Sequence, residues 1–369
     1  MSRRFLSDIR VVDLSQYLPG PFATQMLADL GALVVKVEPP TGDPMRRINL
    51  VDCDGMSPAY KLVNAGKTIV RLDLKEAGDR RAFEQLIAHA DILLESYRPG
   101  TLDRLGIGRA RLTELKPDLI HVALSGWGQT GPYRLRAGHD LNYMALGGGL
   151  AGSGTAGTPV IAHPPTADHA TAQQAVLAVL AALFDRQRTG QGAYLDVSLM
   201  ETVLGWQSWS MTLARCGMAP ARGGDLLNGG AAFYQIYRAA DDRFISLGAI
   251  EEKFWATFCS TLDRPDWIAR HSDPLPQTTL IADVAALIGS RPLADWSERF
   301  AGVDCCLEPV LDPTEVPAHP HVEARGQVVE TAGPNPLTQV LLGLRIDDAP
   351  PPDRIPLRET DIETLLQDW

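Results

Sequence analysis

The sequence contains a histidine that could act as a base at the predicted start of a helix. His139 lies in the tripeptide Gly138-His139-Asp140, directly before a predicted helix over 140–146. A histidine beside a carboxylate can serve as a general base near neutral pH, although a single histidine is more often structural. Asp140 is by itself a typical N-cap residue. The tripeptide therefore indicates either a tuned base or an ordinary helix start.

Asp168 is the second candidate for proton or acyl chemistry. It lies in the first turn of the longest apolar helix, predicted over about 167–188, and Thr166 is the expected cap. A carboxylate at this position usually does no more than complement the helix dipole. The same dipole favours the ionised form, so Asp168 is also available as a base or a nucleophile.

Glu251 is the third candidate, and its position allows two roles. It follows a predicted strand over 244–249 and precedes a predicted helix over 252–262. Either it caps that helix in the ordinary way, or it reaches into a cleft and holds a catalytic histidine.

Three basic residues beyond the ends of predicted strands are candidates for phosphate contacts. They are Lys75, Arg98 and Arg104. Ligands of open α/β sheets bind outside the carboxyl ends of the strands, although ordinary surface charge is the commoner explanation for any one of these residues. The loop over 15–20 has only one glycine of the G-x-G-x-x-G pattern, so a dinucleotide-binding turn is not predicted.

The composition argues against several classes of protein. Lys and Arg number 34 against 45 Asp and Glu, a net charge of −11, which disfavours general nucleic-acid binding. The longest apolar run, 175–184, is about half the ~20 residues of a membrane span. The first residues show no apolar signal core, so export is not expected, and five scattered cysteines without a CxxC indicate thiols in a reducing cytoplasm. No pattern indicates a metal site.

Alternating strands and helices in the first 125 residues predict an α/β fold that positions these side chains. Short spacing and apolar strands indicate a buried parallel sheet. The expected division is a large α/β domain over 1–190, a helical linker over 191–225, a small α+β domain over 226–320 and a returning segment over 321–369. The predicted strands of the large domain are 9–14, 33–38, 68–74, 92–95 and 119–125, and further predicted helices are 77–88, 110–115, 197–214, 278–288 and 293–300.

Several stretches of the sequence match the motifs of one enzyme family. They follow one another along the chain in the same order as in that family. They include Val11–Leu14, Pro19–Pro21, Leu27–Glu38, Asp73–Lys75, Glu95–Gly100, Arg104–Gly106, Ser125–Pro132, Gly138–Tyr143, Asp168, Arg188–Gly192 and Gly248–Glu251. On these stretches the chain resembles the class III CoA-transferase (CaiB/BaiF) family, and within it the α-methylacyl-CoA racemases. Transferases of the family usually carry an aromatic residue at the position of His139, so this histidine favours the racemases.

The resemblance implies an architecture and a substrate class. It implies a Rossmann-like large domain with a parallel sheet, a smaller α+β domain and an interlocked homodimer. In that dimer the site lies between one chain's large domain and the partner's small domain. Coenzyme A is then part of the substrate, so no cofactor, metal, nucleic acid or membrane is expected as a partner.

The resemblance also assigns roles to residues. Catalysis falls to His139 and Asp168, and Glu251 orients the histidine of the partner chain. The racemases often have an arginine where this chain has Pro39, so Arg46 or Arg47 is the expected substitute for that phosphate contact. The implied CoA-binding residues are Leu72, Asp73, Leu74, Lys75, Ser96, Tyr97, Arg98, Arg104, Gly138, Asp140, Leu141, Asn142 and Tyr143.

The expected reaction is the racemisation of 2-methylacyl-CoA thioesters in lipid metabolism. His139 and Asp168 flank the α carbon in this hypothesis, and backbone N–H groups at the helix start near Asp140 or Asp168 meet the enolate charge. Two alternatives stay open: a CoA-transferase that forms an acyl anhydride on Asp168, and an inactive acyl-CoA-binding protein. The expected apolar surface for the acyl chain includes Met144, Met211 and Met218.

Overall fold

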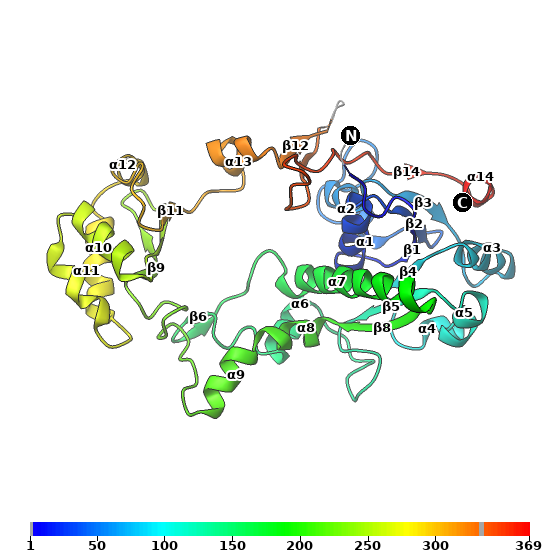
Figure 1. Ribbon diagram of the computed structural model, residues 1–369, viewed down its shortest axis with the longest axis horizontal. Coiled ribbons are helices and arrows are strands. Elements are labelled where there is room, and N and C mark those ends of the chain that lie inside the picture. The colour runs from blue at the N-terminus through cyan, green and yellow to red at the C-terminus, as the bar shows by residue number, and fades with distance from the viewer. Residues whose placement is uncertain (1–2, 332–335) are drawn as a thin grey trace. The chain divides into compact units, whose positions relative to one another are not determined.

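A computed structural model describes residues 3–331 and 336–369, which divide into two compact units (Figure 1). The larger, the sheet unit, comprises Met1–Gly147, Ala162–Gly205 and Ala318–Trp369. The smaller, the small unit, comprises Gly148–Ile161 and Trp206–Pro317. The small unit is therefore an insertion into the chain of the sheet unit.

A seven-stranded parallel sheet forms the centre of the sheet unit (Figure 1). Its strand order is β14-β3-β2-β1-β4-β5-β8. The chain adds β2 and β3 on one side of β1 and then β4 on the other, which makes β1/β4 a switch point of the kind where α/β sheets bind ligands. The strands are β1 (Arg10–Leu14), β2 (Leu33–Glu38), β3 (Thr68–Arg71), β4 (Ile92–Glu95), β5 (Ile120–Ser125), β8 (Ala193–Ser198) and β14 (Arg358–Glu359).

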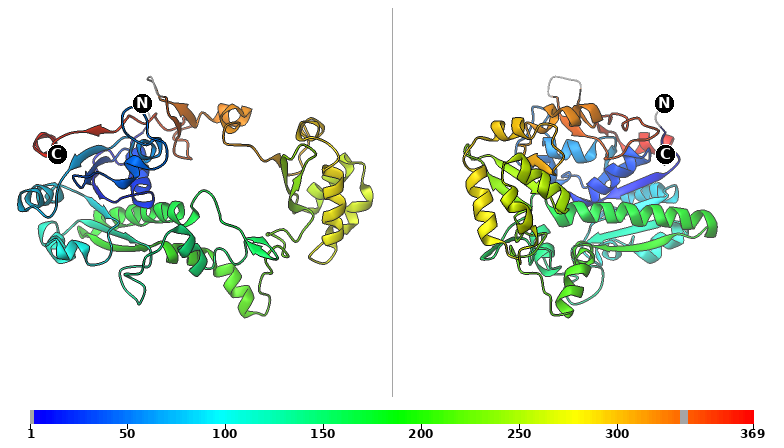
Figure 2. Two further views of the ribbon diagram at one scale, coloured as in Figure 1. Left: turned by 180° about the vertical axis from the view of Figure 1, so that it is seen from behind. Right: turned by 60° about the vertical axis from the view of Figure 1, so that its left-hand side comes forward.

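Helices cover both faces of this sheet. On one face, Phe83 and Leu112 of the helices α3 and α5 share a core with Val12 and Leu93 of the strands. The strand residues in between face the other way, where α1 and the long helix α7 pack on each other and on the sheet (Figure 2). The helices are α1 (Pro19–Asp29), α2 (Pro58–Asn64), α3 (Ala77–Ala88), α4 (Thr101–Arg104), α5 (Arg109–Leu115), α6 (Asp140–Leu146), α7 (Thr166–Thr189), α8 (Leu199–Trp206), α13 (Pro320–Arg325) and α14 (Ile362–Asp368), with the 3-10 turn η1 (Pro44–Arg47).

The small unit packs helices against an antiparallel sheet of order β11-β10-β9. Trp255, Trp267 and Trp296 are buried in its core, and the indole N–H of Trp255 donates to the Trp267 carbonyl at 2.9 Å. Its elements are β6 (Gly154–Thr155), β7 (Thr158–Pro159), α9 (Ser208–Arg215), β9 (Tyr234–Arg238), β10 (Phe244–Gly248), α10 (Glu252–Thr261), η2 (Pro265–Ser272), α11 (Thr278–Ile288), α12 (Leu293–Arg299) and β11 (Leu307–Pro309); η3 (Val316–Ala318) and the hairpin β12 (Val328–Glu330) and β13 (Thr338–Val340) follow.

The predicted α/β class, with a large parallel sheet, is confirmed, and two predicted elements differ in their bounds. The helix expected over 197–214 consists of two helices, α8 and α9, and its first two residues belong to the strand β8, which the sequence analysis did not predict. β8 is an edge strand with partly exposed residues, so it lacks the continuous apolar run that marks the central strands. The third strand ends at Arg71 rather than at residue 74.

Candidate active site

His139 occupies the N-cap position of α6. Its backbone N–H donates to Asn142 Oδ1 at 3.0 Å, which fixes the turn that leads into the helix. The residue is exposed, so its imidazole is accessible. Asp140 is the first helical residue and not the cap, so the expectation of an ordinary Asp140 cap is wrong.

Asp140 instead connects the starts of two helices. Its Oδ1 accepts a hydrogen bond from the backbone N–H of Asp168 at 3.0 Å, although the two residues are 28 positions apart. The first N–H groups of a helix have no partner within the helix, and here a carboxylate from another helix supplies one. Thr166, the expected cap, is the first helical residue of α7, and Pro165 holds the cap position. His139 and Asp168 are thereby brought to neighbouring helix starts.

Asp168 is a partly buried carboxylate with an acidic neighbour. Burial raises its pKa, the charge of Asp140 raises it further, and His169 and His139 lower it, which leaves the pKa at about 6. Burial and Asp140 thus oppose the helix dipole that the sequence analysis expects to keep Asp168 ionised. A carboxyl group with this pKa is ionised at neutral pH and accepts a proton readily, as a general base requires.

Tyr143 supports the turn that carries His139. Its hydroxyl donates to the Gly138 carbonyl at 2.7 Å, and its ring lies 4.8 Å from that of Trp127 in an edge contact. A Cβ at Gly126 would lie 2.2 Å from the Tyr143 hydroxyl oxygen, and one at Gly138 would lie 2.8 Å from the tyrosine ring. Only glycine fits at these two positions, so the glycines let the aromatic ring brace the loop.

A second histidine, His169, also acts on the Asp168 carboxylate. Its Nδ1 lies 2.7 Å from the Pro165 carbonyl oxygen, and its ring packs on that of Phe22 at 5.2 Å. These contacts hold the ring in place. The sequence analysis gives His169 no role, and its position directly after Asp168 is the one local signal that could have found it.

A cavity of 210 Å³, here called the strand-end cavity, lies at the carboxyl ends of the central strands. It brings together the implied CoA residues Leu72–Lys75 and Tyr97. The loop that follows β3 is braced, because Lys75 N–H donates to Asp73 Oδ1 at 3.0 Å and Asp73 N–H donates to Asp79 Oδ2 at 2.6 Å. The other lining residues are Leu14, Val37, Glu38, Pro39, Thr101 and Leu105.

The segment after β4 connects this cavity with the α6 start. The Ser96 hydroxyl accepts from the backbone N–H of Gln16 at 3.1 Å across the switch point. Burial and the charge of Asp168 raise the pKa of Tyr143, and the positive charge of Arg98 partly opposes them. Arg98 therefore lies near the base of the His139 turn. Arg104 donates to the hydroxyl of Thr101 at 2.9 Å, and both Arg98 and Arg104 are exposed.

Of the other site residues that the resemblance implies, some are exposed and some are buried. Leu141 is 42% exposed and Asn142 is exposed, whereas Tyr143 is buried and uses its hydroxyl on Gly138. Glu251 belongs to the small unit, where it is exposed at the N-cap position of α10. Its side chain makes no capping hydrogen bond, so ordinary capping does not account for it.

A match to a protein-family model decides the family. The model of CoA-transferase family III matches residues 6–357 of the sequence. The chain belongs to CoA-transferase family III. The resemblance inferred from the sequence motifs is confirmed.

The protein is similar both to racemases and to CoA-transferases. It is 35% identical over 335 residues to the α-methylacyl-CoA racemase of Homo sapiens, covering 88% of this chain and 82% of that protein. It is 32% identical over 355 residues to the succinyl-CoA:mesaconate CoA-transferase of Haloarcula hispanica, covering 91% and 88%. The crystal structure of a CaiB/BaiF family protein from Brucella suis matches with a TM-score of 0.84 and 27% identity, over 96% of each chain. Similarity alone does not distinguish a racemase from a transferase.

Residues 3–331 and 336–369 contain no helix that is long and apolar enough to cross a membrane. No group of three or more histidine, cysteine, aspartate or glutamate side chains gathers there in a way that could hold a metal ion.

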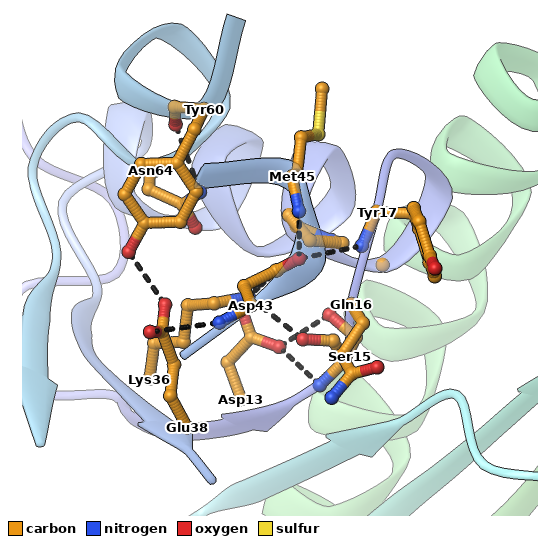
Figure 3. A network of polar contacts seen from close by, with 12 residues as sticks. Asp13, Ser15, Gln16, Tyr17, Lys36, Glu38, Asp43, Met45, Tyr60 and Asn64 are labelled. Carbon is orange, nitrogen blue, oxygen red and sulfur yellow. Dashed lines mark hydrogen bonds and ion pairs between the residues drawn. The ribbon is translucent and has the colours of Figure 1, made fainter. Parts of the chain in front are cut away.

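A network of buried charges that the sequence analysis missed lies beside the switch point (Figure 3). Asp13 and Lys36 are neighbours in the register of β1 and β2, and both are fully buried. Lys36 Nζ donates to the Ser15 carbonyl at 2.7 Å and pairs with Asp43 at 2.9 Å, while Lys67 pairs with Asp13 at 3.1 Å. Polar residues inside two apolar strands are the signal that could have revealed it. The network holds the turn after β1 in place.

Proposed function

We propose that this protein is a racemase of 2-methylacyl-CoA thioesters. One observation carries the proposal: an imidazole and a carboxylate, His139 and Asp168, stand at helix starts tied together by Asp140. The thioester carbonyl acidifies the neighbouring C–H bond, so inversion needs one group to remove the proton and another to return one from the opposite face. The 35% identity to a racemase supports the same reaction.

For one of the two enantiomers, Asp168 and His139 act as follows. The Asp168 carboxylate takes the α proton, and the electron pair of the C–H bond moves into the thioester to give an enolate. The protonated imidazole of His139 then delivers a proton to the other face, and the enolate pair forms the new C–H bond. Asp168 ends protonated and His139 neutral, and exchange with solvent resets both. The roles are exchanged for the opposite enantiomer.

The enolate oxygen needs hydrogen-bond donors placed in advance. The backbone N–H of Asp168 already donates to Asp140 at 3.0 Å, so it is a poor candidate. The start of α6, next to His139, is the better one. The pKa of Asp168, about 6, suits a group that must both take and give a proton in each cycle.

A homodimer with sites shared between chains is part of this proposal. Glu251 would orient His139 of the partner, and its exposed side chain without a capping hydrogen bond is compatible with that role. Co-expression of a His139→Ala chain with a Glu251→Gln chain tests it. A heterodimer with shared sites has one intact site and regains about half of the wild-type activity, whereas sites within one chain give no recovery.

The decisive experiment incubates the protein with (2R)-2-methyldecanoyl-CoA in D₂O, with and without a free carboxylic acid. A racemase incorporates deuterium at the α carbon and forms the 2S isomer without needing the acid. His139→Ala and Asp168→Ala should each lower this exchange by about 10²–10⁴-fold. Undiminished exchange in both variants would refute the assignment.

A CoA-transferase reaction is the second candidate, because Asp168 is ionised above about pH 6 and similar transferases exist. Its carboxylate would attack the thioester carbonyl, expel CoA thiolate and form an acyl anhydride. A second carboxylate would attack the aspartyl carbonyl of this anhydride, release the first acid and form a new anhydride. The CoA thiolate would then attack the second acid's acyl carbonyl, which gives the new thioester and frees the Asp168 carboxylate. Transfer of CoA to the added acid, and trapping of Asp168 by hydroxylamine, identify this reaction. Binding of acyl-CoA without exchange or transfer would indicate an inactive binding protein.

A further inference from the structure

A second cavity lies at the opposite edge of the parallel sheet, where the strands begin. Leu33 is the first residue of β2, Thr68 of β3 and Arg358 of β14, and all three line it. Its volume is 280 Å³, and we call it the strand-start cavity. Its described lining residues are all different from those of the strand-end cavity, so it is separate from the edge at which α/β sheets bind their substrates.

A buried ion pair between Arg354 and Asp29 forms part of the wall of this cavity. Nε of Arg354 donates to Asp29 Oδ1 at 2.7 Å and Nη2 donates to Oδ2 at 2.6 Å, and the two side chains are only 8% and 4% exposed. The third guanidinium nitrogen, Nη1, has no hydrogen-bond partner among the described residues. Because a carboxylate holds one edge of this planar group, the direction of its remaining N–H donors is fixed, which suits an oxyanion.

Two further arginines of the lining, Arg4 and Arg358, are exposed. Arg358 Nε donates to the Thr68 hydroxyl at 2.9 Å, and neither arginine forms an ion pair with a residue that the structure describes. The three arginines and two aspartates, Asp29 and Asp353, give the lining a net charge of +1, although the whole chain carries −11. This balance favours a ligand with a single negative charge over a polyanion.

The rest of the lining is largely apolar. Leu33 and Ile355 are 52% and 66% exposed, whereas Leu365 is buried. The indole N–H of Trp369 donates to the Leu86 carbonyl at 3.0 Å, which holds the ring in the wall. An apolar cavity with a few fixed polar groups is typical of a small-molecule site. At roughly 30 Å³ for a group the size of water, the 280 Å³ hold about nine such groups.

We propose that the strand-start cavity binds a monocarboxylic acid whose apolar chain has roughly eight carbons. The carboxylate binds to Nη1 of Arg354 and to Arg4 and Arg358, and the chain lies against Leu365 and Trp369. None of these residues takes part in the proposed racemase reaction, so the inference stands or falls apart from it. The acid connects the segment after residue 350 with the strand starts, and its binding therefore stabilises the folded protein.

Calorimetric titration of the full chain with octanoate tests the inference. Acetate lacks the chain and 1-octanol lacks the charge, so we expect each of them to bind at least tenfold more weakly than octanoate. Arg4→Met and Arg358→Met, combined in one chain, should weaken octanoate binding about tenfold or more, because methionine keeps the apolar part of the side chain and removes the charge. Arg81→Met, at an exposed arginine of α3, is the matched control and should leave the affinity unchanged.

Tryptophan fluorescence identifies the cavity that the acid occupies. Octanoate should change the emission of the wild type, and this change should be lost in Trp369→Phe, because Trp369 lines the strand-start cavity. Melting temperatures without ligand that equal the wild-type value show that the variants are folded.

Three results would overturn the inference. They are the absence of octanoate binding to the wild type, an affinity that the two arginine substitutions leave unchanged, and a loss of binding in Asp168→Asn that the arginine variant does not share. In the last case the acid would occupy the proposed active site. Absent deuterium exchange in a protein that still binds octanoate would contradict the racemase proposal alone.

Discussion

Two aspartates of the sheet unit, Asp13 and Asp168, have pKa values that are shifted in opposite directions. Asp13 is fully buried, and burial alone would raise its pKa, but Lys67, Lys36 and the hydroxyls of Ser15 and Thr24 lower it to about 2. Asp168 is only partly buried, yet its pKa is raised to about 6, by burial and then by the charge of Asp140.

The neighbours, more than the depth of burial, therefore decide what each carboxylate can do. Lys67 has a pKa lowered by burial to about 8 and still carries its charge at neutral pH, so Asp13 stays ionised and structural. Asp168 instead has an acid, Asp140, that raises its pKa and two histidines, His169 and His139, that lower it. Asp13 therefore keeps a single protonation state at neutral pH, whereas Asp168 can gain and lose a proton.

The largest expected effect is on catalysis at Asp168. Asp168→Asn keeps the size of the side chain and removes the base, so the rate of α-proton exchange should fall by about 10²–10⁴-fold while the melting temperature changes little. His169→Gln is the matched control, because that histidine lowers the pKa of Asp168 and has no proton-transfer role in the proposed reaction, so it should lower the rate less than tenfold. Equal losses in the two variants would mean that Asp168 is not the base.

Asp13 should show the reverse pattern, a large loss of stability. Asp13→Asn leaves Lys67 and Lys36 buried with less compensating charge, and breaking such a pair costs about 3–5 kcal/mol of unfolding free energy. Denaturant unfolding measures the change. Asp8→Asn, at an exposed aspartate, should change it by less than about 0.5 kcal/mol. A stable Asp13 variant would show that the lysines are compensated by other groups.

Glu95 extends the comparison, because it is a buried carboxylate and no lysine or arginine among the described residues shifts its pKa. Burial raises its pKa to about 8, and His121, 4.0 Å away, has a pKa lowered by burial to about 4, so both are neutral at pH 7. The folded state holds the Glu95 proton more tightly than the unfolded state, so this stability is complete below about pH 4.5 and is lost as the pH rises through 8.

Glu95→Gln should remove this pH dependence. Between pH 6 and 9 the wild type should lose about 2–3 kcal/mol relative to the variant, as measured by denaturant unfolding at both pH values. The glutamine oxygen can still accept from the Tyr97 N–H, as Glu95 does at 2.7 Å, which keeps the loop after β4 in place. Parallel curves for the two proteins would show that Glu95 is ionised throughout this range.

The smallest expected effect is a shift of the pH profile. Since the ionised form of Asp168 acts as the base, kcat/KM should fall as the pH drops through about 6. Asp140→Asn removes the neighbouring charge but keeps an oxygen that accepts the Asp168 N–H, so this limb should move down by about 0.5–1 pH unit. A limb that does not move would assign it to another group.

The sequence predicted the elements with strong local signals. β2 and β4 match the predicted strands 33–38 and 92–95 residue for residue, because each is a short apolar run with a clear end. The family motifs led to His139 and Asp168, which stand at helix starts where the apolar pattern placed them. These features depend on neighbours in the chain.

The features that the sequence analysis missed depend on distant residues. The bond from Asp168 to Asp140 spans 28 positions, and the pairing of Lys67 with Asp13 spans 54. β14 has two residues and no pattern of its own, and it exists because β3 offers a free edge. Arg46 and Arg71 line one cavity with Glu359 of β14, and both arginines pair with that glutamate. The local spacing of apolar residues predicts helices and strands, but it does not predict such long-range contacts.

The position of β14 also bears on how the protein is made. Arg358 Nε donates to the Thr68 hydroxyl at 2.9 Å across 290 positions, and Glu359 completes the ion pairs of Arg46 and Arg71. The ribosome must therefore extend the chain beyond residue 359 before this edge of the sheet can close. Until then the nascent chain carries an open strand edge at β3, and in this period it is prone to aggregate.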